Sequence, residues 1–530
     1  MSSRSWLAAF TAAATLCLSA SAQIEDSGLQ MVDPWGMGFL EAGEPVLPAS
    51  MWRASSTETL LPMMRAVRTQ GLTPGERTLM RRMALSPATA PQGDQSPALL
   101  AERARILFEL GEARPAASLM ARLEISPPGL DSDEIATDLN LALGNEAMAC
   151  AESTSALREG AYWAKLRAVC AALRDNTAGA ELAIEMASSQ GVNDSWLTSA
   201  VFAASGDLPN PPQARYDSGI ALAISSKAGL APSDTALSPT RPDLAAAMVA
   251  RPGLPAAKRA EAAAIAAQAG LIDVAAWHQV LDTLFEDPEF EPRSKVEIAI
   301  ATIRNVAMPN DGRADAIADA LQEAGINPAR FAAVSAGPAP ELASLSLTNE
   351  TAKHARLFAR ASIAAEDFEG MLLWTLVPTL DEAPETRAFD FAYIHALGVL
   401  SGSGDAAQIG ETLVTEAVGK DDRKAAARLF ALWTMTGITP PPSGRALMAS
   451  DSEAPGKASK PGAVLAILAN AEAGAAGEAI LATVGLVNGD ASKLDVADLA
   501  LVGRALNTIG AQDAASALAL EATGYWKAAK

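Results

Sequence analysis

Apolar side chains recur along most of the chain at the three- and four-residue spacing that places them on one face of an α-helix. In one such pair of predicted helices, Leu100, Ala104 and Leu107 share a face of the first helix. Gly111 follows, and glycine readily adopts the left-handed conformation that ends a helix. The second helix, Ala113–Leu123, carries small alanines that permit close approach. The pattern therefore predicts a compact helix–turn–helix unit.

Turn signals recur after this unit at Gly111, Gly144, Asp175-Asn176 and Gly206, at spacings of 33, 31 and 31 residues. This period is close to the two-helix repeat of about 34 residues found in tetratricopeptide arrays. The stretch Leu99–Gln190 thus resembles tetratricopeptide-like repeats in its period and in the small residues beside its turns. The tetratricopeptide consensus residues are not recoverable, so the resemblance concerns architecture. It implies an all-α fold, an α-solenoid of helical hairpins.

Two cysteines lie in the middle of this region, each ten residues from Gly160. The pattern predicts consecutive helices over Glu134–Leu143, Glu146–Arg158 and Tyr162–Leu173, with a fourth after Ala178. In an antiparallel hairpin turning at Gly160, equal residue counts bring Cys150 and Cys170 level, because both helices rise by about 1.5 Å per residue. We therefore predict a disulfide between them, the alternative being two buried free thiols.

Other stretches break the helical pattern. Ahead of the repeats, Pro62–Gln70 and Pro74–Ala84 are predicted to form a first helical pair around Gly71, each opening on a proline. The expected organisation comprises a signal peptide (1–22), an extended arm (23–56), an N-terminal helical repeat region (57–206), a Pro/Ser-rich break (207–241), a middle helical region (242–438), a flexible loop (439–461) and C-terminal helical hairpins (462–530).

The arm carries three aromatic anchors, Trp35, Phe39 and Trp52. They suggest a segment that binds a partner or fills the groove of the array. The alternative is that Trp35 and Trp52 only dock the arm onto the helices. Tyr525 and Trp526 at the other end are expected to cap the last apolar face, as terminal repeats require.

Composition supports a large helical core in an exported protein. Hydrophobic residues make up 49% of the 530 residues, charged residues 19% and aromatic residues only 5%. Arg4, the apolar run Trp6–Leu18 and the small residues Ala20-Ser21-Ala22 are typical of a signal peptide cleaved after Ala22. A disordered or membrane-anchoring N-terminus is the alternative. Leu16 is too bulky for lipoprotein processing at Cys17. We expect a periplasmic or secreted protein without a membrane span in its mature chain.

Charge narrows the class of partner. The formal net charge is −21, and removing the signal peptide with Arg4 makes it −22. An acidic surface repels phosphate backbones and anionic lipids, so nucleic acid is not an expected partner. Two cysteines left in an exported chain also favour a disulfide over reduced thiols.

No pattern of catalytic or ligand residues was found. His278, His354 and His395 have no second ligand at metal spacing. Gly402–Ala407 matches the outline of a dinucleotide loop, but that loop follows a strand and here a helix is predicted before it. The acidic run Glu286–Glu291 does not match the pattern of a calcium-binding loop. The acidic run Asp131–Glu134 fits the capped start of a helix. We predict no catalytic, metal or cofactor site.

Two hypotheses of function follow. The first is a non-enzymatic scaffold or assembly factor that binds another protein of the cell envelope. The alternative is a peptidoglycan-associated enzyme, or an activator of one. Periplasmic lytic transglycosylases resemble the chain in their Ala-rich helical composition. Glu152-Ser153 lacks the sequence that follows the catalytic Glu-Ser in that family. The identity of the partner and the oligomeric state are not readable from the sequence.

Overall fold

The fold is all-α, as predicted. A computed structural model of the chain describes residues 33–94, 96–154, 158–206, 208–288, 290–337, 339–380, 387–451 and 461–527. The predicted signal peptide (1–22), the first part of the expected arm (23–32) and residues 452–460 lie outside these ranges. Within the described residues there are 27 α-helices and no strand, only one isolated bridge between Ser56 and Gln92. None of these helices has the length and apolar character needed to cross a membrane.

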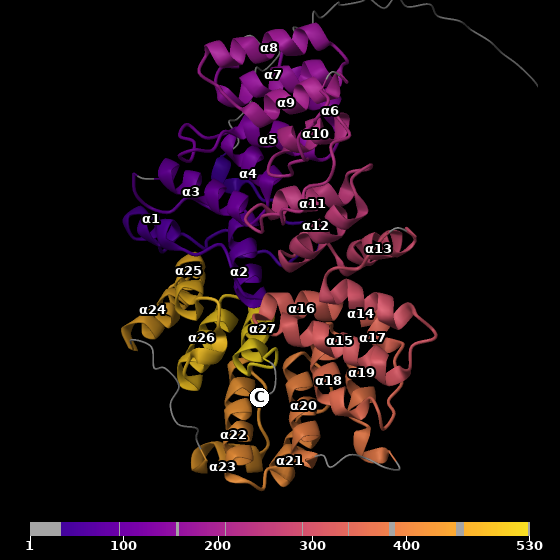
Figure 1. Cartoon of the computed structure of the whole chain (residues 1–530). Helices are drawn as coiled ribbons and strands as arrows, with labels where there is room; N and C mark the ends of the chain where they lie inside the picture. The colour runs from indigo at the N-terminus through magenta and orange to yellow at the C-terminus, as the bar shows by residue number, and fades with distance from the viewer. Residues whose placement is uncertain are drawn as a thin grey trace, which may run out of the picture. The chain divides into compact units, whose positions relative to one another are not determined.

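Most of the helices follow one another with short connections, and longer ones lie on either side of α10 (Figure 1). The first thirteen are α1 (Thr57–Ala66), α2 (Pro74–Leu85), α3 (Ser96–Glu109), α4 (Ala113–Met120), α5 (Ser132–Ala142), α6 (Glu146–Glu152), α7 (Ala161–Leu173), α8 (Thr177–Ser189), α9 (Ser195–Ala204), α10 (Gly219–Lys227), α11 (Pro242–Ala250), α12 (Ala256–Gln268) and α13 (Val274–Phe285). The others are α14 (Lys295–Arg304), α15 (Asn310–Ala324), α16 (Pro328–Ala336), α17 (Ala339–Ala343), α18 (Ala355–Ala364), α19 (Phe368–Trp374), α20 (Ala388–Leu400), α21 (Ala406–Glu416), α22 (Lys420–Met435), α23 (Pro442–Ser450), α24 (Pro461–Glu472), α25 (Ala476–Val487), α26 (Val496–Thr508) and α27 (Gln512–Ala522). Short 3₁₀ turns are η1 (Pro34–Gly36), η2 (Ala352–His354), η3 (Val377–Thr379) and η4 (Ala491–Lys493).

The periodic turn signals end helices as expected. Gly111, Gly144 and Gly206 have φ angles of 91°, 85° and 80°, and Asp175 has a φ of 57°. These values lie in the left-handed region, which glycine enters at little cost and aspartate tolerates. The turn residues read from the sequence therefore mark the ends of every second helix in this part of the array, α3, α5, α7 and α9.

The first helix begins earlier than predicted. It starts at Thr57, and Pro62 lies inside it and not at its first turn. The Ser56 hydroxyl accepts from the backbone N–H of Thr59, which provides the N-terminal cap. Proline cannot donate a backbone hydrogen bond inside the helix. Leu60 is buried on the same helix, and its packing offsets the missing hydrogen bond.

Both predicted interruptions contain helices. In the Pro/Ser-rich stretch 207–241, α10 packs against α5 and α7, and Leu222 and Ile224 are completely buried. In the stretch 439–461, expected to be a loop, α23 begins at Pro442 and packs against α22. The sequence interpretation was wrong at α23 because the prolines before it were taken as breakers. Pro442 occupies the first helical turn, where no N–H is needed.

The two ends of the array pack against each other. In Figure 1, α2 lies beside α25 and α27, and the contacts confirm both pairings. The backbone N–H of Gly75 donates to Oε1 of Glu521 at 2.8 Å, and that of Gly489 donates to Oε1 of Glu76 at 3.0 Å. Arg82 of α2 also forms an ion pair with Asp513 of α27. Helices from the first and last quarters of the chain thus share one hydrophobic core.

Candidate functional site

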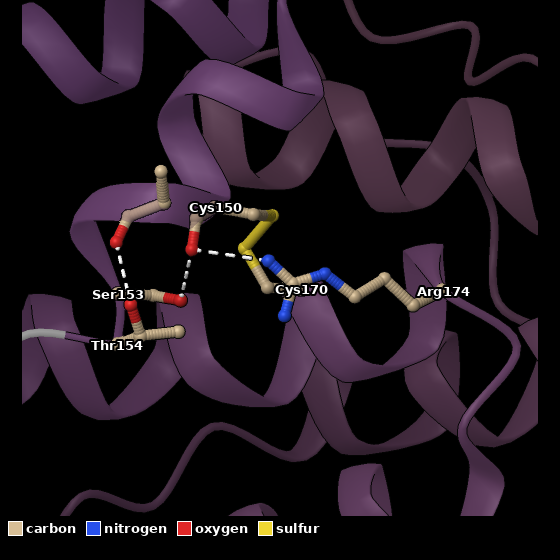
Figure 2. The surroundings of a disulfide bond; sticks show 6 residues. Cys150, Ser153, Thr154, Cys170 and Arg174 are labelled. Carbon is tan, nitrogen blue, oxygen red and sulfur yellow. Dashed lines mark hydrogen bonds between the residues drawn. A yellow bond between two sulfur atoms is a disulfide. The ribbon is translucent and has the colours of Figure 1, made fainter.

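The predicted disulfide joins α6 to α7 (Figure 2). The Cα atoms of Cys150 and Cys170 are 5.5 Å apart, and both side chains are buried. The carbonyl oxygen of Cys150 accepts from the Ser153 hydroxyl at 2.8 Å and from Nη2 of Arg174 at 3.2 Å. Its buried position makes the bond a structural cross-link between neighbouring helices.

The route between the two cysteines differs from the predicted hairpin. Helix α6 ends at Glu152, six residues before the expected end at Arg158. The hydroxyls of Ser153 and Thr154 donate to carbonyls three residues earlier, and such bonds satisfy carbonyls left free at a helix end. Gly160, with a φ of 110°, begins the next arm. The turn residue was predicted correctly, while the first arm is only partly helical.

Of the three arm residues expected to bind a partner, Trp35 and Trp52 are buried and Phe39 is partly buried. Trp35 and Trp52 are each 2% exposed and contact each other edge to face, with ring centroids 6.5 Å apart. Phe39 is partly buried against the same core, and its N–H donates to the carbonyl of Leu85 at 2.8 Å. The described part of the arm, from residue 33 onward, is therefore docked on the helices, the alternative that the sequence left open.

A buried arginine that the sequence analysis missed holds this arm in place. Arg103 of α3 donates to the carbonyls of Met37 at 2.8 Å, Ser86 at 2.9 Å and Ala84 at 2.8 Å. Burial lowers the pKa of Arg103 to about 10. Arg103 lies three residues after Leu100 and four before Leu107, so its place on the predicted core face was a sign of burial in the sequence. The carbonyls it binds were not predictable, because they belong to other segments.

The histidines lie apart from one another. His354 contacts Asp315, with 2.6 Å between Nε2 and Oδ1, and His395 contacts the hydroxyl of Thr375 at 2.8 Å. Burial lowers the pKa of His395. Among the described residues, no group of three or more His, Cys, Asp or Glu side chains is arranged to hold a metal ion.

The glycine-rich turn 402–407 follows helix α20, as predicted, and leads into α21. Ser403 and Asp405 of this turn, together with His395 of α20, line a cavity of about 390 Å³. The carboxylate of Asp405 accepts from the backbone N–H of Ala407 at 2.9 Å, which caps α21. The aspartate is therefore used by the helix start, and the turn is a helix corner.

Helix α8 exposes apolar side chains. It packs on α7 and α9, and only Ala180 and Ala187 of the helix are buried. Leu182 is 57% exposed and Met186 is 50% exposed, and residues four apart lie on the same side of a helix. Glu181 and Glu185 precede them and are also exposed. We call these four residues the α8 face. The sequence signal that could have indicated this exposed face is the glutamate directly before each of the two apolar residues.

Comparisons with protein-family models, with curated proteins and with solved structures found no match.

Proposed function

We propose that the protein is an exported scaffold of the cell envelope that binds another protein through the α8 face. The exposure of Leu182 and Met186 on a helix with few packing partners is the observation that carries this proposal. Exposed apolar side chains gathered on one face are typical of protein-binding sites. Two large exposed side chains four residues apart suit an apolar segment of a partner.

Charge indicates which partner fits. Glu181 and Glu185 flank the apolar pair, and the chain as a whole carries a net charge of −21. Complementary charge favours a partner segment with Lys or Arg beside its apolar residues. The partner we propose is therefore a basic, amphipathic segment of an envelope protein.

The disulfide supports export. Such bonds persist in oxidising compartments and are rare in the cytosol. The Cys150–Cys170 bond lies in the same group of helices as the α8 face. We propose that the signal peptide is removed after Ala22. The amino-terminal sequence of protein recovered from the periplasm should then begin at Gln23, and recovery of uncleaved protein in the cytoplasm would contradict export.

A pair of variants tests the binding proposal. The double variant Leu182→Asp/Met186→Asp places two charges in the face, whereas Leu465→Asp places one on α24 at a leucine of similar exposure, 55%. After cross-linking in intact cells, wild type and Leu465→Asp should capture the same protein. The double variant should capture at least about tenfold less of that protein, because a few buried anchor side chains carry most of the binding energy of an interface.

The captured protein should be cross-linked through a segment bearing Lys or Arg. Equal capture by the double variant would exclude the α8 face as the binding site. Purified sacculi test the alternative function, because binding of all three forms to peptidoglycan, without a protein partner, would favour a cell-wall role.

A further inference from the structure

A large cavity lies where segments distant in the sequence meet. It measures about 520 Å³ and is lined by the loop between α1 and α2, by the first residues of α11 and α16, and by the turn after α25. Three cationic side chains, Arg68, Arg77 and Lys493, contribute to the lining. A volume of this size is typical of sites for small organic molecules.

The two acidic side chains in the cavity wall are already neutralised. Oε2 of Glu109 accepts from Nη1 of Arg105 at 2.6 Å and from the Thr69 hydroxyl at 2.6 Å. Asp490 lies 3.2 Å from Nζ of Lys493 and 3.7 Å from Nζ of Lys527. These carboxylates therefore have partners of their own, and the nearest acidic groups to Arg68 and Arg77, Glu76 and Glu112, act on them only through longer-range electrostatics.

Arg68 and Arg77 have no such partner. Within the described residues, no carboxylate lies at ion-pair distance from either guanidinium. Arg68 donates only to carbonyl and amide oxygens, including the Asn488 carbonyl at 3.2 Å. Arg77 makes one long hydrogen bond, 3.4 Å, to the carbonyl of Leu110, and its buried Nε has no acceptor. A buried donor without an acceptor is costly, and a ligand oxygen would remove that cost.

The backbone around Arg68 is shaped to hold it. Gly71 and Gly489 have φ angles of 63° and 85°, and a Cβ at either residue would lie 2.4 Å or 3.0 Å, respectively, from a guanidinium nitrogen of Arg68. The arginine thus lies between two glycine turns from opposite ends of the chain. A guanidinium fixed in this way presents its remaining donors with little loss of conformational entropy.

We propose that this cavity binds a small organic oxyanion with at least two negative charges, held by Arg68 and Arg77. Carboxylates and phosphates share the oxygen geometry that guanidinium groups recognise. Leu72 and Ile265 in the wall provide contact for an apolar portion of the ligand. The acidic surface repels anions in general, so binding depends on this local pair of cations.

Ligand binding also stabilises the contact between the two chain ends. Arg68 precedes α2 and Asn488 follows α25, so an anion bound beside them contacts both sides of that junction. A ligand that binds only the folded protein raises its melting temperature. The effect should weaken as salt is added, because the attraction is largely electrostatic.

Citrate and pyrophosphate are the probes: citrate is an organic carboxylate, and pyrophosphate, which is inorganic, tests recognition of phosphate groups alone. Isothermal titration of the full mature chain should show saturable binding of at least one of them, together with an increase in melting temperature. Arg77→Gln should weaken binding by about tenfold or more. Arg122→Gln, which removes an exposed arginine without a side-chain hydrogen bond in the described structure, should bind like wild type.

Arg68→Lys keeps a positive charge but loses the planar donor set, and it should weaken binding while the protein stays folded. The relative effects of citrate and pyrophosphate identify the ligand class. Absence of binding of both probes to the wild-type chain would overturn the proposal, as would equal affinity of wild type and Arg77→Gln.

Discussion

Two regions of the molecule reach stability by different means. The closing region comprises the docked arm from residue 34, α1–α4 and α24–α27, whose side chains share one core although they come from opposite ends of the sequence. The disulfide lobe comprises α5–α10, and its core, which extends to α11 and α12, comes from one continuous stretch of the sequence. In the closing region Trp35, Trp52 and several methionines fill the core, while alanines and leucines predominate in the lobe.

Polar and covalent contacts also differ between the closing region and the disulfide lobe. The closing region has buried hydrogen bonds between its two halves, such as Gly75 to Glu521 and Gly489 to Glu76. The disulfide lobe also joins distant segments, since the Ile220 N–H donates to Oδ1 of Asp138 at 3.2 Å, but it adds a covalent link between adjacent helices. Joining distant segments costs more chain entropy than joining neighbours. The comparison teaches that large aromatic residues and specific buried polar bonds offset that cost at the junction, while the lobe combines the packing of small residues with a local covalent cross-link.

Removing Trp52 should have the largest effect. Its ring is packed so closely on α25 that a Cβ at Gly477 would come within 1.9 Å of it. Trp52→Ala is expected to lower the free energy of unfolding by about 3–5 kcal/mol because it leaves a large cavity. Trp196→Ala, at a partly exposed indole in the disulfide lobe, should cost clearly less. Urea denaturation followed by circular dichroism measures both, and equal losses would contradict the comparison.

Loss of the disulfide should have the second-largest effect on stability, and it should destabilise mainly the disulfide lobe. In the double variant Cys150→Ala/Cys170→Ala, the free energy of unfolding is expected to fall by about 3 kcal/mol, because the unfolded chain is no longer restricted by the closed loop. Hydrogen exchange should increase in α6 and α7 and change little in α25 and α27. A reductant should reproduce the effect in the wild type. If it destabilised the double variant equally, the cross-link would not be the cause.

The closing region should depend on pH through Glu521. Burial raises the pKa of Glu521 to about 8 from an ordinary value of 4.5. Between these values the unfolded chain releases the proton and the folded protein retains it. Stability from this group is therefore complete below pH 4.5 and is lost as the pH rises towards 8. The loss should exceed about 1 kcal/mol, because a tenfold difference in proton affinity between the folded and unfolded states is equivalent to about 1.4 kcal/mol.

Glu521→Gln keeps an oxygen for the Gly75 N–H but cannot ionise. Its melting temperature should fall less between pH 5 and pH 9 than that of the wild type. Glu124→Gln, at an exposed glutamate, should retain the wild-type slope. A Glu521→Gln profile parallel to that of the wild type would show that this carboxylate does not control the junction.

Helix caps should give the smallest effects and should be similar in both regions. Asp194 caps α9 in the lobe by accepting from Leu197, and Asp495 caps α26 in the closing region by accepting from Ala497. Asp194→Ala and Asp495→Ala are each expected to lower the free energy of unfolding by about 1 kcal/mol, since the partly exposed ion pair of Asp194 with Nζ of Lys165, at 2.8 Å, adds little. Thermal denaturation of the two variants tests this. A much larger loss for either one would show that its region depends on more than the local cap.

Much of the local structure was predictable. Gly144 and Gly160 were identified as turns because few other residues adopt a left-handed conformation cheaply. The Cys150–Cys170 pairing followed from their equal distance to Gly160. The helix at Pro442–Ser450 was missed, since a proline reads as a breaker unless its place in the first turn is known.

The residues of the α8 face and of the cavity were harder to find. A hydrophobic pattern shows that Leu182 and Met186 lie on one side of a helix, but it does not show that this side lacks a neighbour. Arg68 and Arg77 looked like ordinary surface arginines. Their lack of acidic partners became visible only when the segments lining the cavity were placed.

By itself the sequence determined the helices, most of their ends and the local cross-link, because these depend on residues within a few turns of one another. The tertiary structure decided that the two chain ends meet, that Trp35 and Trp52 are buried there, and which charges stay unpaired. Those outcomes depend on contacts between segments hundreds of residues apart. Periodicity along a single chain carries no record of such contacts, because any apolar face can be buried by more than one partner.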